Sequence, residues 1–328
     1  MMEPKYAGFL PRAVRGRRAY LFHPARRTAP RRGGFLGRAL MRGQEARPNG
    51  ADYVYCEELL RRDDRDRWLA SLFAPPELRR HIHALYAFSL EIARVREIVS
   101  EPLLGEIRFQ WWRDVIEGTN EGDAKANPVA AALLDTIARF GLPKAPLLEL
   151  IVARGHDLYD DPMQSLEALE AYTKATSANL LRLAALILDG EEAPASRDAA
   201  LHAGIAYGIT GLIRALPWHS ARGQVFVPAG ILQAHGASRD DFAAGRASEA
   251  VLAAIADLLA RARAHLDIFY ATLPGLPEKS RPAFLPACLC EPYLRLMEKP
   301  GYEPFKTVIE LPQWRRQWIL WRAARRWG

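Results

Sequence analysis

Apolar residues recur at helical spacing along most of this chain from about Tyr53 onward. Between residues 77 and 99, for example, Ile82, Leu85, Ser89 and Ile92 follow one another at steps of three or four positions. This spacing places side chains on one face of an α-helix. The same criterion predicts the following further helical segments: residues 66–73, 103–117, 128–140, 146–159, 166–188, 196–216 and 248–272.

Patterns typical of β-strands are almost absent. Only residues 224–227 look extended, and this segment is too short to form a sheet. Residues 274–286 are interrupted by prolines and are expected to be irregular, with helices resuming near Leu289 and Trp314. No internal repeat or Gly/Ser-rich linker divides the chain. The sequence therefore predicts an all-α fold with one domain over residues 51–328.

The basic character of the protein is confined to its first 50 residues. These contain 11 Arg and 1 Lys against Glu3 and Glu45, a net charge of +10, so the rest of the chain carries −3 of the total of +7. A nucleic-acid partner for the domain is therefore not expected. We predict a disordered basic tail over residues 1–50. Its composition leaves three interpretations open: a mitochondrial-type transit peptide, although it lacks Ser, a basic arm, or a gene model whose true start is Met41.

Neither a transmembrane helix nor a disulfide or zinc framework is expected. No window reaches about 18 uninterrupted apolar residues. The three cysteines, Cys56, Cys288 and Cys290, are too few and too unevenly spaced for either kind of framework, and a reducing compartment is expected.

The C-terminal segment combines tryptophan with arginine. Trp314, Trp318 and Trp321 follow the i, i+4, i+7 pattern of one helix face, and arginines flank them. Such a helix suits the interface of an anionic membrane. The alternative is a terminal helix whose tryptophans dock on the rest of the domain.

Residues 208–228, GITGLIRALPWHSARGQVFVP, resemble the second signature of the squalene/phytoene synthase superfamily. That signature runs approximately N-x-x-R-D-x-x-E-D, followed by A-R-R-G-R and an aromatic residue before Leu-Pro. In an ungapped placement Gly211 takes the Asn position and Arg214 the Arg position. The acidic positions hold Ala215, Trp218 and His219.

Residues 83–88, HALYAF, resemble the start of the first signature, after which the superfamily has a D-D-x-x-D cluster. Here the sequence continues SLEIARVREIVSE. The same placement puts Ala93 and Arg94 in the first two Asp positions and Glu97 in the last. Thus most of the predicted acidic positions hold other residues.

The resemblance implies a helical isoprenoid synthase fold with a central cavity. Superfamily enzymes ionise an allylic diphosphate with Mg²⁺, which is held by carboxylates on facing helices. Without these carboxylates we expect neither a catalytic site nor a bound metal cofactor. The alternative is a reduced Mg²⁺ site at Glu97 and Glu101, which lie four residues apart. By the same resemblance, Tyr86, Tyr207, Arg214 and Arg222 are candidate ligand-binding residues; structural ion pairs for the arginines are the alternative.

The domain resembles one branch of the superfamily in more detail, through residues 87–114, 214–232 and 235–242. This branch contains a mitochondrial complex I assembly factor and its bacterial relatives. It implies a pseudoenzyme that assists complex I assembly, with complex I subunits or assembly intermediates as partners and an isoprenoid or other lipid as a cavity ligand. The expected location is the cytoplasmic membrane face in a bacterium, or the matrix side of the inner membrane in a mitochondrion. The alternative is a head-to-head prenyltransferase of isoprenoid biosynthesis with the reduced metal site.

Overall fold

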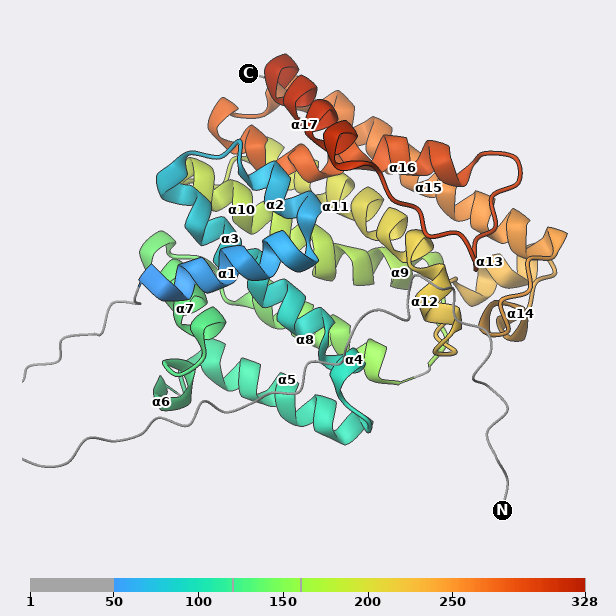
Figure 1. The fold of residues 1–328 in the computed structure, drawn as a ribbon, viewed down its shortest axis with the longest axis horizontal. Helices are drawn as coiled ribbons and strands as arrows, with labels where there is room; N and C mark the ends of the chain where they lie inside the picture. The colour runs from blue at the N-terminus through green and yellow to red at the C-terminus, as the bar shows by residue number, and fades with distance from the viewer. Residues whose placement is uncertain (1–49, 120, 160, 328) are drawn as a thin grey trace, which may run out of the picture. The chain divides into compact units, whose positions relative to one another are not determined.

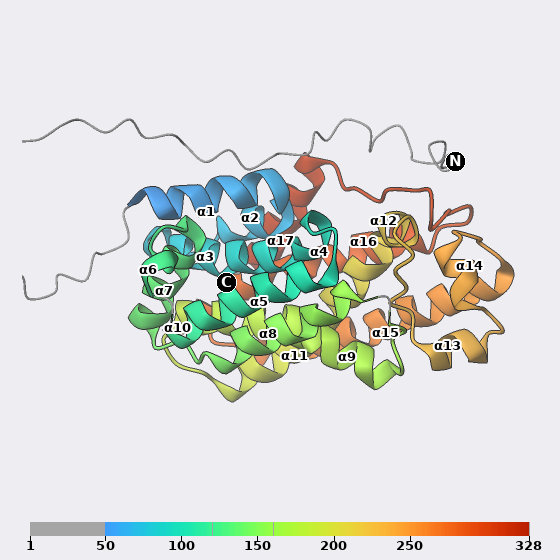
Figure 2. The same cartoon turned by 90° about the horizontal axis from the view of Figure 1, so that it is seen from below.

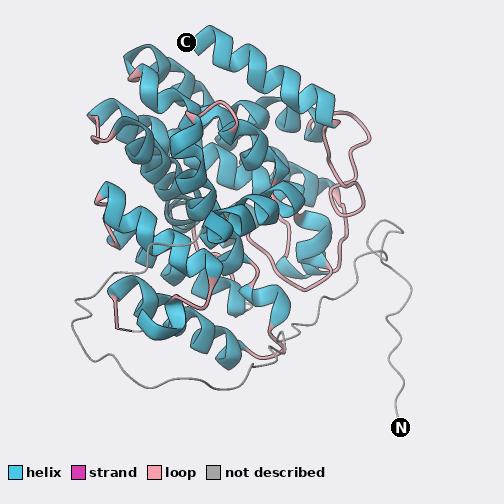
Figure 3. Cartoon of the chain, turned by 60° about the vertical axis from the view of Figure 1, so that its left-hand side comes forward, coloured by secondary structure: helices cyan, strands magenta, loops and turns pink. Residues whose placement is uncertain are grey.

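The computed structural model describes residues 50–119, 121–159 and 161–327. The predicted basic tail therefore lies outside the described residues, apart from Gly50, which begins the first helix. Figure 3 shows that the described chain consists of helices and loops, and no strand occurs among these residues. The prediction of an all-α fold is confirmed.

The helices fall into long core elements and short connecting ones (Figure 1). The α-helices are α1 (Gly50–Asp63), α2 (Arg65–Ser71), α3 (Pro76–Ala93), α4 (Val95–Ile98), α5 (Pro102–Glu117), α6 (Glu121–Ala124), α7 (Pro128–Phe140), α8 (Ala145–Gly155), α9 (Leu166–Thr173), α10 (Asn179–Asp189), α11 (Pro194–Arg214), α12 (Leu216–Ser220), α13 (Ala229–Ala234), α14 (Arg239–Ala243), α15 (Glu249–Thr272), α16 (Cys290–Met297) and α17 (Gln313–Trp327). The 3₁₀ helices are η2 (His156–Leu158), η4 (Leu273–Gly275) and η5 (Glu278–Leu289), and η3 (Lys174–Ala178) is a π-helical turn.

Helices α11 and α15 form the longest packed pair, and α10, η3 and η5 also contact α11 (Figures 1 and 2). Buried alanines such as Ala199, Ala203 and Ala206 line α11 and allow neighbouring helices to approach closely. Proline is the first residue of α3, α5, α7 and α11. At this position its missing N–H costs no helical hydrogen bond.

Three sequence-based boundaries differ from the structure. The segment predicted as one helix over 77–99 is interrupted at Arg94, which separates α3 from α4. The segment over 166–188 contains a π-helical turn, η3, between α9 and α10. Residues 274–286 were expected to be irregular, but residues 278–286 belong to the 3₁₀ element η5, because side chains such as Phe284 and Leu289 pack into the core.

A close approach between α11 and η3 depends on Gly204. A Cβ atom added to this residue would overlap the backbone N and Cα of Ala178. The wider π turn therefore lies directly against a helix that has no side chain at the contact point. The three cysteines are free and buried.

Acid destabilisation is expected from a buried histidine of α3. The ring of His83 lies 2.8 Å from the Ser71 hydroxyl, and burial lowers its pKa to about 4. In the unfolded chain the His83 ring takes up a proton near pH 6.5, whereas in the folded protein it stays neutral down to about pH 4. The folded state is therefore fully stable with respect to this residue above pH 6.5 and loses stability as the pH falls toward 4. We expect the free energy of unfolding to fall by about 1 kcal/mol per pH unit in that window from this residue. Urea unfolding of wild type and His83→Gln at pH 7 and pH 5 measures the difference; equal pH dependence would contradict it.

Candidate functional site

The first predicted signature lies where α3 ends and α4 begins. Ala93 is the last residue of α3, and Arg94 follows it as the cap. The guanidinium of Arg94 lies 2.8 Å from the carboxylate of Asp63, at the end of α1. Glu97 therefore provides the one carboxylate among these three predicted positions. It lies in α4 and is exposed.

The second predicted signature lies at the junction of α11 and α12. Ala215 separates the two helices, and Trp218 is partly exposed on α12. The His219 ring packs against Phe226 with centroids 4.7 Å apart, and its Nδ1 atom is buried without a hydrogen-bond partner among the described residues. Burial, and next the positive charge of Arg154, lower the pKa of His219 to about 3. Such a weak base does not fit general acid–base chemistry at neutral pH.

The structure brings the two signatures together through an ion pair. The Arg222 Nη1 atom lies 3.4 Å from the Glu97 carboxylate, across 125 positions of sequence. Both side chains are partly exposed, at 39% for Arg222 and 50% for Glu97, so this pair contributes about 0–1 kcal/mol. A guanidinium thus occupies the side of Glu97 that faces the second signature.

The residues at this junction do not fit Mg²⁺. The ion requires several oxygen ligands in near-octahedral geometry, and the predicted positions supply Glu97 beside two arginines and a histidine. Glu101 is the N-cap residue that precedes α5, and it does not complete a ligand set. Within the described ranges no group of three or more His, Cys, Asp or Glu side chains is arranged to hold a metal ion.

Tyr86 and Tyr207, the predicted cavity residues, face the same guanidinium. Arg67 of α2 lies 5.1 Å from the ring of Tyr86 and 5.3 Å from that of Tyr207. Its Nη1 atom also lies 3.4 Å from Asp64 and donates to the Ser89 hydroxyl at 3.4 Å. Burial raises the pKa of Tyr86 to about 12, although Arg67 opposes the shift, so both phenols remain neutral beside the cation.

Arg214 belongs to a second internal network, which is centred on Asp66. Its guanidinium lies 3.5 Å from the centre of the Tyr293 ring and 3.6 Å from the Asp66 carboxylate. Asp66 also forms an ion pair with Arg316 of α17 at 3.1 Å and accepts a hydrogen bond from Tyr293. The structure thus gives Arg214 the structural ion pair that was the alternative to ligand binding, and its ligand-binding role stays a prediction.

A third network joins the end of α8 to the second signature. Asp157 is buried, pairs with Arg154 at 2.8 Å and accepts a hydrogen bond from Tyr172 at 2.8 Å. Gln224 donates to the Asp157 carbonyl. A pocket of about 760 Å³ opens beside this network between α8, α9 and η3. Tyr86, Tyr207, Arg214 and Arg222 do not line it.

Comparison with known proteins establishes the family. Residues 60–322, which include both signatures and all three networks, match the family described as squalene/phytoene synthase. The chain belongs to the squalene/phytoene synthase family. The family resemblance predicted from HALYAF and from residues 208–228 is confirmed.

Relatives within the squalene/phytoene synthase family include assembly proteins. The chain is 34% identical over 258 residues to the rat (Rattus norvegicus) protein named NADH dehydrogenase (ubiquinone) complex I, assembly factor 6, covering 79% of this chain and 77% of that protein. It is 33% identical over 308 residues to the mouse (Mus musculus) protein of the same name, covering 91% and 92%.

Solved structures of family members share the fold. The squalene synthase HpnC from Alicyclobacillus acidocaldarius is 26% identical, with a TM-score of 0.65 over 78% of this chain and 96% of that one. A dehydrosqualene synthase in complex with a ligand has a TM-score of 0.71 at 17% identity, over 84% and 96%. The predicted isoprenoid synthase fold is therefore confirmed.

Sequence reasoning missed three charged residues of these networks. Arg67, Asp66 and Arg154 were not predicted to matter, although each is a charged residue within a helix that is otherwise packed into the core. A charge at a core-facing helical position signals a buried partner. It does not say which distant residue that partner is.

Proposed function

We propose that this chain assists the assembly of respiratory complex I and does not catalyse prenyl condensation. The observation that carries the proposal is the 33% identity to the mouse assembly factor over 91% of the chain. The similarity also extends over 92% of the mouse protein. The partners would be complex I subunits or assembly intermediates.

The chemistry at the junction of the two signatures supports the absence of catalysis. Ionising an allylic diphosphate releases a highly charged diphosphate, whose negative charge must be neutralised. The family resemblance implies that Mg²⁺ does this. In this chain the carboxylate of Glu97 contacts Arg222, and Arg94 contacts Asp63. The charges that would recruit metal ions are instead neutralised by arginines of the same chain.

The proposed location follows from the proposed role. Complex I is a membrane enzyme, so the protein would work at the cytoplasmic membrane face in a bacterium or at the matrix face of the inner membrane in a mitochondrion. No helix within the described ranges is long and apolar enough to cross a membrane.

The rival function is head-to-head prenyl transfer with a reduced metal site at Glu97 and Glu101. The 26% identity to the squalene synthase HpnC is the observation in its favour. Because Glu97 is held by Arg222, this rival requires the ion pair to open when substrate and Mg²⁺ bind.

We expect no release of diphosphate when the purified protein is incubated with farnesyl or geranylgeranyl diphosphate, with or without Mg²⁺. A squalene synthase of the family, assayed in parallel, provides the positive control. Mg²⁺-dependent release that disappears in Glu97→Gln would establish the rival function.

The assembly role has a separate test in cells. Deleting the gene is expected to lower NADH:ubiquinone oxidoreductase activity and the amount of assembled complex I, and the wild-type gene is expected to restore both. Normal complex I in the deletion strain would contradict the proposed role, whatever the diphosphate assay shows.

A further inference from the structure

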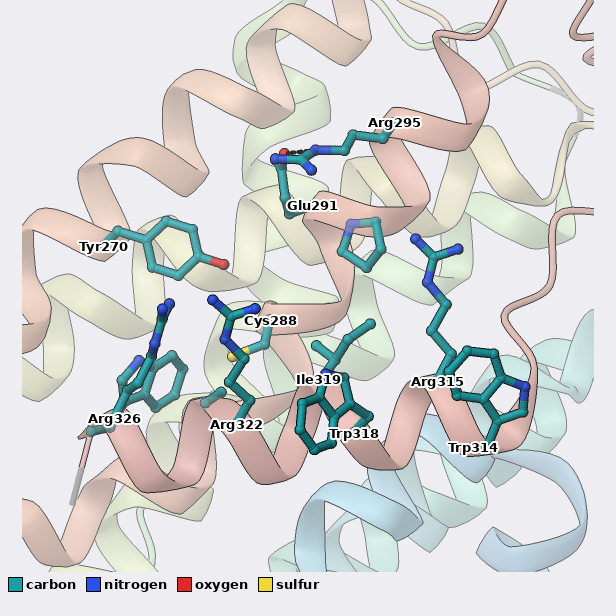
Figure 4. A pocket seen from close by; sticks show the side chains of 13 residues that line it. Tyr270, Cys288, Glu291, Arg295, Trp314, Arg315, Trp318, Ile319, Arg322 and Arg326 are labelled. Atoms are coloured by element: carbon teal, nitrogen blue, oxygen red, sulfur yellow. Dashed lines mark hydrogen bonds and ion pairs between the residues drawn. The ribbon is translucent and has the colours of Figure 1, made fainter.

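A groove of about 650 Å³ runs along the C-terminal helix α17, where it faces α15, α16 and η5. Figure 4 shows Arg315, Arg322 and Arg326 projecting from α17 toward Tyr270 of α15 and Glu291 of α16. The apolar part of the lining comes from both sides of the groove: Pro292, Trp314, Trp318, Ile319, Ala323 and Trp327. The groove thus combines aromatic walls with several guanidinium groups.

The groove carries an uncompensated positive charge. Arg315, Arg322 and Arg326 have no ion-pair partner among the described residues. Arg295 adds a fourth guanidinium. Glu291 is the one carboxylate in the lining, and it already pairs with Arg295 at 2.5 Å and with Arg263 at 2.7 Å.

Arg316, on the same helix, has a structural role and provides a comparison for the groove arginines. Arg316 faces the body, is buried and forms an ion pair with Asp66. Leu320 and Ala323 complete the body-facing side of α17. The three groove arginines form no comparable ion pair among the described residues, so their charge is available to a ligand.

Helix α17 also exposes large aromatic side chains, of which Trp314 and Trp318 line the groove. Trp314 is 69% exposed, Trp318 is 55% exposed and Trp321 is 42% exposed. The rings of Trp318 and Trp321 stack at 5.1 Å, and Arg325 lies over Trp321 at 5.2 Å. Trp327 packs edge-on against Phe269 of the body, whereas Trp314, Trp318 and Trp321 keep a large part of their surface exposed.

We propose that this groove binds the headgroup phosphate of an anionic phospholipid at a membrane surface. Guanidinium groups bind phosphate oxygens in a bidentate way, and indole rings favour the boundary between headgroups and acyl chains. A free phosphate ester would use the arginines and leave the exposed indoles without a role. A phospholipid in a bilayer uses both, because the exposed tryptophans enter the interface next to the bound headgroup.

Vesicle binding of the full chain tests the proposal. The probes are vesicles of phosphatidylcholine alone and vesicles with about one quarter phosphatidylglycerol, and binding is followed by flotation and by tryptophan fluorescence. We expect binding and a blue shift with the anionic vesicles only. The groove variant R315Q/R322Q/R326Q should weaken partitioning about fivefold per arginine, on the order of a hundredfold in all.

A matched variant distinguishes an effect of the groove arginines from an effect of the protein's net charge. R61Q/R108Q/R139Q removes the same three charges from exposed arginines of α1, α5 and α7, and should change partitioning less than about threefold. Equal losses in the two triple variants would overturn the proposal, as would unchanged binding of the groove variant or equal binding to uncharged vesicles. A second variant, W314A/W318A, should abolish the blue shift while its thermal midpoint stays near that of wild type.

A soluble competitor distinguishes a lipid from a free phosphate ester. Glycerol phosphate at millimolar concentration is expected to leave vesicle binding intact, because it lacks the acyl chains that the indoles contact. Displacement by this compound would show a site for soluble phosphate esters and would overturn the lipid assignment. None of these assays contains complex I, so their outcome is independent of the proposed assembly role.

Discussion

Replacing Asp66 by asparagine is expected to lower the free energy of unfolding by about 3–5 kcal/mol. The side chain of Asp66 is 8% exposed and holds Arg214 of α11, Arg316 of α17 and the Tyr293 hydroxyl of α16. Without its charge, two largely buried guanidinium groups lose their common carboxylate. Urea unfolding followed by circular dichroism measures the change.

Asp267→Asn is the matched control for this prediction. Asp267 is exposed on α15, and its substitution should change stability by less than about 0.5 kcal/mol. If Asp66→Asn cost less than about 1 kcal/mol, water would have to solvate both arginines in the folded protein. The network would then be a surface feature, contrary to its burial.

Gly204→Ala is expected to destabilise the protein by about 2–3 kcal/mol, although alanine is the better helix former. The added methyl group would overlap backbone atoms of Ala178, which cannot move aside as the end of a flexible side chain can. Helix α11 and the π turn η3 would have to separate, which would loosen the packing on both sides. The thermal midpoint and the urea midpoint should both fall.

Gly211→Ala on the same helix should have the opposite sign. A Cβ atom at Gly211 meets no other atom within 4 Å, so the substitution gains up to about 1 kcal/mol of helix propensity without a steric cost. Stabilisation by both substitutions would show that α11 and η3 can separate freely. The close approach at Gly204 would then contribute nothing to stability.

The helical fold was predictable because it is encoded locally. Apolar spacing and the prolines at positions such as Pro76, Pro128 and Pro194 place helix starts without reference to the rest of the chain. The break at Arg94 was not predictable in this way, since the apolar spacing continues through it. The tertiary ion pair between Arg94 and Asp63 accompanies that break, and periodicity contains no information about tertiary partners.

The sequence predicted which segments form the candidate site, but not which side chains contact one another within it. Motif spacing located the segments of Glu97 and Arg222, and the structure brings them into contact. It also located Tyr86 and Tyr207. That the guanidinium of Arg67 would approach both rings depends on how α2 packs against α3 and α11, which no local pattern specifies.

The pairing of Arg94 with Asp63 limits which single substitutions at the first signature the protein can accept. An aspartate at position 94 would remove one of the two arginines that contact Asp63, leaving Arg62, and would add a second carboxylate nearby. A carboxylate at position 219 would lie within the electrostatic reach of Arg154 and Arg222. Each single substitution toward a carboxylate at these positions would therefore meet residues that already pair with or lie near arginines. Building a metal site at this junction would require several coordinated substitutions, because the effect of each one depends on the others.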